Sequence, residues 1–428
     1  MSLNHVNLKP IKLIFLVLLT VLTVAACSSP PPEPVPTAQP TEAPEEGQTI
    51  TIITPDAENV DTVNAPKYQI QTKLTDFELL STSEGIAWGV TKNSLRLYLT
   101  HDNGETWANI SPSANIQFSS NPVYGKNIFF TDPNNGWIIR GAYGITETIV
   151  LRTHDGGVNW KVSSLGDANP VSSIFFISPK RGWVLTTWDS SSYKESKALY
   201  STINGGATWS AIMQNEQYSP ITPNPSIPIP GVITGMLFSN NRFGIAALQT
   251  SALPKIYTTN DGGLNWRAGQ SFLVNPQLED CDRVITGKPH FFGDTSMGWM
   301  PVGCQLDKDN SVTFHGYFTS NGGAIWKFKS FTLNRQVGVN RTTPPVFLNS
   351  SMGWALKDNV LFQTKDQGTI WSPLPINKVL QSKLKEYPEV VKLQFFSENL
   401  GWLLLEKKED KKSILLESTN GGISWRVI

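Results

Sequence analysis

The sequence predicts an all-β protein, a seven-bladed β-propeller of four-stranded antiparallel blades. Two observations support this fold class. The pattern [Ser/Thr]-x-[Asp/Asn]-x-Gly-x-x-Trp occurs seven times, and its tryptophans lie 45 to 60 residues apart. A Gly-Trp pair, or a variant such as Gly244-Ile245, precedes each copy of the pattern. One aromatic signature per unit at near-even spacing is typical of propeller blades.

One unit shows how four strands fit between these markers. Lys126–Thr131, Gly136–Gly141 and Thr148–Thr153 are short apolar stretches, and Trp160–Ser163 follows the octapeptide. Pro133-Asn134-Asn135 is a turn signal between the first two stretches. We therefore expect strands over these four ranges, with the octapeptide as the turn between the third and fourth strands.

The octapeptide itself has the composition of a tight turn. Its third residue can accept backbone N–H bonds of its own turn, and its glycine suits a positive φ. We expect the hydroxyl at the first position to tie the turn to the adjacent strand. The third positions are Asp102, Asp155, Asn204, Asp261, Asn321, Asp366 and Asn420. Because three of them lack a charge, we expect all seven to be structural, with no catalytic or metal-binding role.

Composition excludes several functional classes. The chain has 428 residues, more than one core supports, but a ring of repeats packs only neighbour on neighbour. Lys+Arg 35 balances Asp+Glu 35, so no dense basic face is expected and nucleic acid is not a predicted partner. The five histidines show no ligand spacing, and neither a metal nor a cofactor is predicted.

The N-terminal segment predicts export from the cytoplasm. Lys9 and Lys12 precede an apolar run, and residues 24–27 read Val-Ala-Ala-Cys. Residues 1–26 are thus expected to be a signal peptide, and Cys27 resembles the lipidated cysteine of a bacterial lipobox. The alternative is an ordinary signal peptide with an incidental cysteine. Lipidation would anchor the protein in the cell membrane on its extracytoplasmic face, with the membrane as a partner.

A Pro- and Glu-rich segment separates the signal peptide from the repeats. Residues 27–67 have no apolar periodicity and are expected to form a disordered tether. The propeller is expected over residues 68–428. The cluster Ile50–Ile53 could add an edge strand to the propeller or be an incidental part of the linker, and the sequence does not decide between these alternatives.

The topology separates two faces of the propeller. The turns between strands one and two share one face with the octapeptide turns, and we call this the turn face. The opposite face, which we call the variable-loop face, carries most of the length variation, and binding is expected there. The alternative is that these loops are idle insertions.

Several residues of the variable-loop face are candidates for binding or cross-linking. Cys281 and Cys304 both fall on this face of blade five, and outside the cytoplasm they are expected to form a disulfide. The candidate binding patch consists of Trp188, Tyr193, Tyr218, Arg335, Arg341, Lys383, Lys385 and Tyr387. The alternative for the charged members is a set of solvated loop tips.

The octapeptides resemble the Asp-box of BNR (bacterial neuraminidase) repeats. Such repeats occur in sialidases, sortilin-type receptors, xyloglucanase-type hydrolases and photosystem II assembly-factor-like proteins. The combination of Gly-Trp with Thr-x-Asp-Gly-Gly-x-x-Trp is most similar to the last group. That resemblance implies a non-catalytic scaffold that binds a protein or cell-envelope partner.

An enzyme is the alternative. Sialidases need three arginines, a Tyr–Glu pair and an acidic Asp, and no arginine trio is evident in the sequence. The expectation is therefore a lipid-anchored, extracytoplasmic binding propeller that is not an enzyme and recognises an unidentified protein or envelope glycan. A sialidase-like or other glycoside hydrolase, or a carbohydrate-binding propeller, is the alternative function.

Overall fold

The computed structural model describes ten stretches of the chain and two single residues. These are residues 51–53, 70, 72–112, 117–140, 147–216, 225–250, 253–270, 272, 275–293, 296–333, 335–337 and 343–428, with gaps between them. All of them belong to one compact unit, Gln48–Ile428. Cys27, Tyr218, Arg341 and almost all of the expected tether lie outside the described residues.

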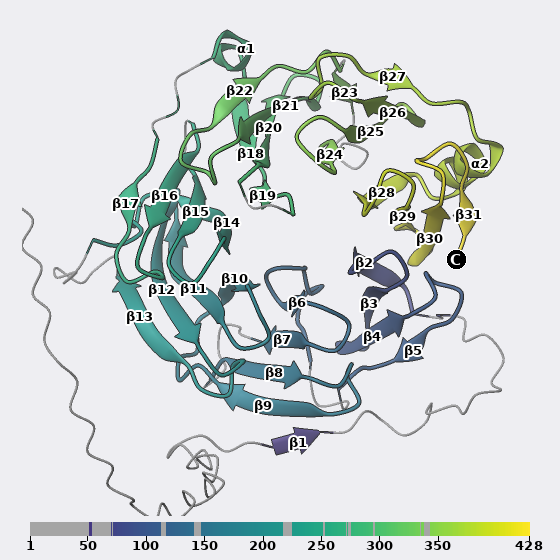
Figure 1. Cartoon of the computed structure of the whole chain (residues 1–428). Helices are drawn as coiled ribbons and strands as arrows, with labels where there is room; N and C mark the ends of the chain where they lie inside the picture. The colour runs from purple at the N-terminus through teal and green to yellow at the C-terminus, as the bar shows by residue number, and fades with distance from the viewer. Residues whose placement is uncertain are drawn as a thin grey trace, which may run out of the picture. The chain divides into compact units, whose positions relative to one another are not determined.

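Seven antiparallel sheets are arranged in a ring, with the first strand of each sheet nearest the centre (Figure 1). Blades one to three contain β2 (Leu74–Leu79), β3 (Gly85–Thr91), β4 (Ser94–Thr100) and β5 (Ala108–Asn109); β6 (Ile128–Phe130), β7 (Gly136–Arg140), β8 (Ile149–Thr153) and β9 (Trp160–Ser164); and β10 (Val171–Phe176), β11 (Gly182–Ser191), β12 (Lys194–Thr202) and β13 (Ser210–Asn215).

Blades four to seven continue the same order. They contain β14 (Val232–Phe238), β15 (Gly244–Gln249), β16 (Lys255–Thr259) and β17 (Arg267–Ala268); β18 (Arg283–Thr286), β19 (His290–Phe291), β20 (Gly298–Leu306), β21 (Ser311–Thr319), β22 (Lys327–Lys329) and β23 (Gln336–Val337); β24 (Val346–Phe347), β25 (Gly353–Lys357), β26 (Val360–Thr364) and β27 (Ser372–Pro373); and β28 (Glu389–Phe395), β29 (Gly401–Lys407), β30 (Lys412–Ser418) and β31 (Arg426–Val427). The predicted fold class, a seven-bladed propeller of four-stranded blades, is confirmed.

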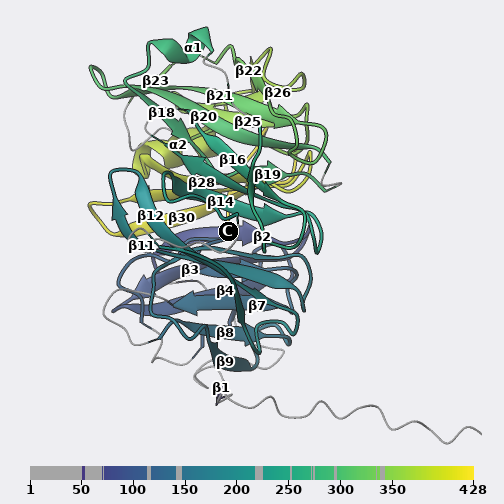
Figure 2. The same cartoon turned by 90° about the vertical axis from the view of Figure 1, so that its left-hand side faces the viewer.

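Three elements add to this pattern. The helices α1 (Pro276–Glu279) and α2 (Lys378–Glu386) lie in connections between blades. β1 (Thr51–Ile53) pairs antiparallel with β9 and forms an extra outer strand of blade two, as Figures 1 and 2 both show. This pairing favours the edge-strand alternative for the apolar cluster near residue 50. Neither helix of the described residues is long and apolar enough to span a membrane.

The Gly-Trp pairs join neighbouring blades. The indole N–H of Trp183 donates to the carbonyl oxygen of Gly262 in the next blade at 2.8 Å, and its ring stacks on Phe238 at 3.7 Å. Trp137 makes the same two contacts with the turn and the phenylalanine of blade three. The glycine of the pair is needed because a Cβ at Gly182 would lie 2.3 Å from the ring of Phe176.

The octapeptides fold into seven equivalent turns. In blade four the hydroxyl of Thr259 donates to Asp261 at 2.8 Å and accepts the N–H of Gly263 at 2.9 Å. Asp261 also accepts the N–H of Asn265 at 2.9 Å. The hydroxyl therefore closes its own turn and does not tie the turn to the adjacent strand, contrary to the expectation. A Cβ at Gly263, where φ is +102°, would clash with Leu199 at 2.7 Å.

The two kinds of short turn lie side by side on the turn face. The N–H of Gly262, within the octapeptide of blade four, donates to the carbonyl oxygen of Arg242 in the turn between β14 and β15 at 2.8 Å. In blade seven, Gly421 donates in the same way to Asn399. The loops between the second and third strands and the connections between blades therefore lie on the opposite face.

The ring closes between blades seven and one without a shared strand. The N–H of Leu74 donates to Ser413 at 2.7 Å, and Lys73 forms an ion pair with Glu406. The indole of Trp402 donates to the side chain of Asn103 at 3.1 Å, where other blades use a backbone carbonyl. Side-chain contacts therefore hold blades seven and one together at this junction, which we call the seam.

Candidate functional site

A cavity of about 710 Å³ occupies the centre of the ring and is lined by all seven blades. Its walls are the first strands of the blades, or the segments that lead into them, which surround the centre in Figure 1. We call this cavity the channel. Asp76, Glu78, Tyr124, Lys288, His290 and Lys392 are the ionisable side chains of its lining.

Strand register arranges the channel side chains in two layers. In every blade the glycine that opens the second strand pairs with one inner-strand residue, which is Leu79 in blade one and phenylalanine in the others. Residues three positions earlier form the first layer: Asp76, Asn127, Ser173, Gly235, Lys288, Pro344 and Lys392. Of these, Asp76, Lys288, Pro344 and Lys392 line the channel. Residues one position earlier form the second layer: Glu78, Phe129, Phe175, Leu237, His290, Val346 and Gln394. The charges therefore come from blades one, five and seven.

Register shifts occur in the inner strands beside the first layer. β2 shifts between Leu74 and Asp76, and β28 shifts between Val390 and Lys392. An extra residue in one strand bends it and changes the direction of a side chain. The shifts lie next to the positions from which Asp76 and Lys392 enter the channel.

Asp76, Glu78 and Lys392 form one cluster across the seam. The ammonium of Lys392 lies 2.6 Å from Glu78 Oε2 and 3.3 Å from Asp76 Oδ1. Gln394 donates to the other oxygen of Glu78 at 3.0 Å. Burial lowers the pKa of Lys392, but the two carboxylates outweigh it and raise this pKa above its ordinary value. The cluster holds two carboxylates close together on one wall.

Tyr124 lies beside this cluster. Burial raises the pKa of its phenol well above the ordinary value, and the nearby charges of Glu78 and Asp76 add to the increase. The hydroxyl donates to the carbonyl oxygen of Phe130 at 3.0 Å, and the backbone N–H of Tyr124 approaches Asp76 Oδ2 at 3.4 Å. Tyr124 therefore remains protonated at neutral pH and supports the carboxylate wall.

Lys288 and His290 face the channel from blade five. Both side chains are exposed, and neither has a hydrogen-bond or ion-pair partner among the residues that the structure describes. Enclosure lowers the pKa of Lys288; Glu78 opposes this change and Lys392 adds to it. Enclosure and the charge of Lys288 lower the pKa of His290 to about 4. These two side chains are available to a solute.

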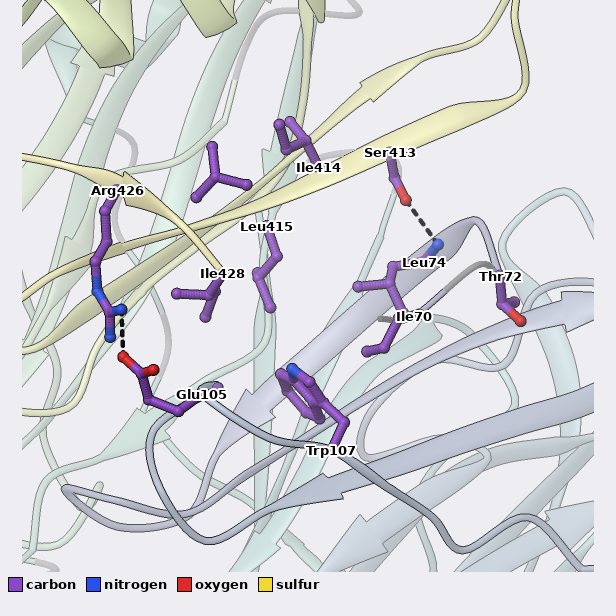
Figure 3. Close-up of a pocket in the computed structure, with 12 residues that line it drawn as sticks. Ile70, Thr72, Leu74, Glu105, Trp107, Ser413, Ile414, Leu415, Arg426 and Ile428 are labelled. Atoms are coloured by element: carbon purple, nitrogen blue, oxygen red, sulfur yellow. Dashed lines mark hydrogen bonds and ion pairs between the residues drawn. The ribbon is translucent and has the colours of Figure 1, made fainter. Parts of the chain in front are cut away.

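A second cavity, of about 430 Å³, lies at the seam (Figure 3). Figure 3 shows Trp107, Leu74 and Ile428 among its walls, with Arg426 facing Glu105. Arg426 pairs with Glu105 and also with Glu417. Because the arginine of this cavity is already paired within the chain, the cavity fits ring closure better than ligand binding.

The predicted binding patch is divided between distant parts of the ring. Trp188 is half-buried in β11, and Tyr193, 40% exposed, lies in the turn between β11 and β12. Lys383 and Lys385 lie on α2, and Tyr387 caps it. Figure 1 places the β11–β12 hairpin and α2 on opposite sides of the ring.

The contacts of the described patch residues are local. The ammonium of Lys383 lies 6.0 Å from the centre of the Tyr387 ring. Arg335 forms an ion pair with Asp309 at 2.8 Å. The described patch residues thus do not form one continuous surface.

The predicted disulfide is confirmed. Cys281 and Cys304 are bonded, with their Cα atoms 5.2 Å apart. The bond links the segment after α1 to β20 on the variable-loop face. Among the described residues, no group of three His, Cys, Asp or Glu side chains is placed to hold a metal ion.

The ionisable channel residues were not identified from the sequence. Asp76, Glu78, Lys288 and Lys392 look like ordinary polar positions of strands, and a variable loop attracts more attention than an inner strand. The available signal was positional, since counting back from the glycine that opens each second strand aligns the inner strands of six blades. Blade five has one more residue between Phe291 and Gly298 and aligns through that phenylalanine. Such an alignment would have shown charges in only three of seven equivalent places.

Comparison with known proteins gives structural neighbours only. No protein-family model matches the chain, and no curated protein matches it. A prolyl endopeptidase structure has a TM-score of 0.50 at 7% identity, covering 83% of this chain and 49% of that chain. The GH74 xyloglucanase from Xanthomonas campestris has a TM-score of 0.33 at 8% identity, covering 83% and 72%. The GH93 α-L-arabinofuranosidase of Fusarium graminearum has a TM-score of 0.38 at 11% identity, covering 83% of this chain and 94% of that chain.

These neighbours show the propeller fold, and they also correct the expected function. The sequence led to the expectation of a non-catalytic scaffold that is not an enzyme, whereas the similar solved structures are mostly glycoside hydrolases and a polysaccharide lyase. The expectation was wrong in treating this fold as a binding scaffold on the evidence of its turns. It rested on residues of the turns and loops, whereas the ionisable cluster lies on the inner strands. At 7–13% identity the likeness extends to the fold alone.

Proposed function

We propose that the channel binds a glycan and cleaves a glycosidic bond, with Asp76 and Glu78 as the carboxylate pair. The observation that carries this proposal is that both carboxylates contact the same ammonium, Lys392, on an open cavity wall. Glycoside hydrolysis generally requires two carboxyl groups, one that protonates the leaving oxygen and one that attacks the sugar or activates water.

The contacts of the two carboxyl groups suggest different roles. Glu78 is held at both oxygens, by Lys392 at 2.6 Å and Gln394 at 3.0 Å, so its orientation is fixed. We assign Glu78 as the group that attacks the sugar or activates water. Asp76 has the longer contact with Lys392, at 3.3 Å, and its Oδ1 also accepts the N–H of Phe77 at 2.8 Å. We assign Asp76, as the other member of the pair, to the role of proton donor.

The walls of the channel suit a sugar as well. Phe129, Phe175 and Leu237 provide an apolar surface in the second layer, and small-molecule sites combine such surfaces with a few polar groups. No arginine belongs to the described lining of the channel, so the three-arginine clamp of sialidases is not favoured. The structural neighbours include enzymes that act on xyloglucan and arabinan, which makes these glycans the first substrates to test.

The test is release of reducing sugar from xyloglucan, arabinan, polygalacturonate and ulvan by the purified propeller. Glu78→Gln is expected to lower turnover about 10³-fold, because the amide cannot attack or accept a proton. Glu398→Gln, an exposed glutamate in the turn between β28 and β29, is the matched control and is expected to leave turnover unchanged. The proposal would be rejected if the wild-type protein cleaved none of the four glycans, or if Glu78→Gln kept full activity.

The resemblance to BNR repeats and the anchor at Cys27 also remain proposals. We propose that residues 27–67 hold the propeller near the outer surface of a membrane, where an envelope glycan or protein would be within reach. Support comes from the basic and apolar N-terminal segment and the cysteine that follows it. Labelled palmitate should enter the wild-type protein and not Cys27→Ala; equal labelling of both would reject the anchor.

A further inference from the structure

We propose that Lys288 and His290 form a subsite for the anionic group, carboxylate or sulfate, of an acidic saccharide in the channel. This inference rests on the proposed function, because it takes the channel as a glycan site. It adds the chemical class of the substrate and assigns its recognition to blade five.

The backbone of blade five places Lys288 in the channel. β18 pairs with β20 as far as Thr286 and Val302, and β19 resumes the pairing with His290 and Trp299. Three residues lie between these pairs on the inner strand, but only two lie between them on β20. The inner strand therefore bulges, and a bulge turns side chains out of their regular direction.

Two glycines leave room for the lysine side chain. A Cβ at Gly235, in the adjacent blade four, would lie 2.6 Å from Lys288 Cγ. A Cβ at Gly125, which leads into blade two, would lie 2.2 Å from Lys288 Nζ. The side chain therefore passes over the inner strand of blade four and carries its ammonium toward blade two. A side chain at position 235 would displace the stem of Lys288 and crowd Pro289, whereas the flexible end of Lys288 could move away from one at position 125.

The charges of the channel favour an anion on this side. Lys392 is already paired with Asp76 and Glu78, whereas Lys288 has no such partner among the described residues. A solute anion near the carboxylate pair would be repelled, so it is directed to the wall of blade five. His290, neutral at pH 7, can donate its ring N–H to the same anion. Charge-assisted hydrogen bonds of this kind are the stronger class.

An apolar surface next to Lys288 and His290 favours a sugar, and not a small inorganic anion, as the molecule that bears the anionic group. Phe175 and Leu237 precede His290 in the second layer, in blades three and four. They offer an apolar face to a sugar ring whose charged substituent reaches blade five. A small inorganic anion would use the charge and leave this face uncovered.

The experiment is calorimetric titration of the Glu78→Gln protein, which prevents turnover, with tetragalacturonate, a sulfated galactan tetrasaccharide and neutral galactotetraose. An acidic tetrasaccharide is expected to bind more tightly than the neutral one, and its affinity should fall with added salt. Lys288→Met should raise Kd for that ligand at least about tenfold. Lys288→Arg, which keeps the charge, should retain most of the affinity. Lys255→Met, an exposed lysine at the start of β16, is the matched control and should change nothing.

Each outcome decides the inference. Equal affinity for the neutral and acidic tetrasaccharides, or an unchanged Kd in Lys288→Met, would overturn it. Binding of the sulfated probe alone would support the subsite with sulfate as its ligand. Glu78-dependent cleavage of neutral glycans alone would keep the proposed function and reject this subsite. If an acidic saccharide binds through Lys288 but the wild-type protein never cleaves it, the subsite would be kept and the proposed function rejected.

Discussion

Lys197 and Lys288 are two lysines in different settings of the same ring. Lys197 is fully buried in blade three, and its ammonium donates to the carbonyl oxygens of Glu195, Ile229 and Gly231 at 2.9–3.2 Å. Burial lowers its pKa to about 8, and Glu195 partly offsets this. Lys288 is exposed to the channel and has no partner in the described chain.

Two histidines repeat the contrast. His315 is buried in β21, and its Nδ1 accepts the N–H of Phe331 at 3.3 Å. His290 faces the channel and has no such partner among the described residues. The scaffold therefore uses its lysine and histidine to satisfy buried backbone groups, whereas the channel leaves the same side chains available. The proposed site therefore rests on unpaired polar groups in an accessible cavity and not on loop length.

The largest effect on stability is expected at the scaffold lysine. Lys197→Met should lower the free energy of unfolding by about 4 kcal/mol, because it leaves Glu195 buried without its cation and three carbonyls without a donor. Lys194→Met, an exposed change on the same strand, should cost less than about 0.5 kcal/mol. Denaturant unfolding measures both. Equal stability of the two variants would contradict the scaffold role of Lys197.

The next effect concerns pH. Burial lowers the pKa of His315 to about 4, from 6.5 in the unfolded chain, so its contribution to stability is present above pH 6.5 and lost as pH falls toward 4. His315→Asn keeps an acceptor and removes the titration. Between about pH 7 and pH 4 the variant should lose about 3 kcal/mol less stability than the wild type. If the free energy of unfolding changed with pH to the same extent in the variant and the wild type, His315 would not be held neutral in the folded protein.

A smaller effect is expected in the repeated turns. Thr259→Val removes the hydroxyl that accepts the buried N–H of Gly263 and bonds Asp261, and should cost about 2 kcal/mol. Thr258→Val, the adjacent residue of β16, is the control and should be nearly neutral. Thermal unfolding measures both. Saccharide binding in the channel should be unchanged at temperatures where the Thr259→Val protein is folded. A loss of binding by the folded variant would contradict the view that the turns contribute to stability and not to the binding site.

The smallest effect is expected for the channel lysine. Lys288→Met should change the free energy of unfolding by no more than about 0.5 kcal/mol, because no described group depends on this ammonium. The measurement is the same denaturant titration as for Lys197→Met. A loss above about 1 kcal/mol would place Lys288 with the scaffold and weaken the contrast between the two lysines.

The sequence was sufficient for the architecture because the repeat is local. Each octapeptide closes its own hydrogen bonds, as Thr259 and Asp261 do. The Gly-Trp pairs contact their own blade and the next one, as Trp137 contacts His154 and Phe176. Short strands such as β7 and β8 therefore lie within two residues of their expected ranges. The disulfide followed for a similar reason, since both cysteines belong to one blade.

The candidate site depends on contacts that the sequence does not reveal. Glu78 and Lys392 are 314 residues apart, and they meet only because the ring brings blade seven against blade one. The bulge that places Lys288 in the channel depends on the pairing of β18 and β19 with β20. Local turn and packing signals thus determined the blades, their number and their disulfide. Closure of the ring decided which side chains face the channel and which of them lack partners.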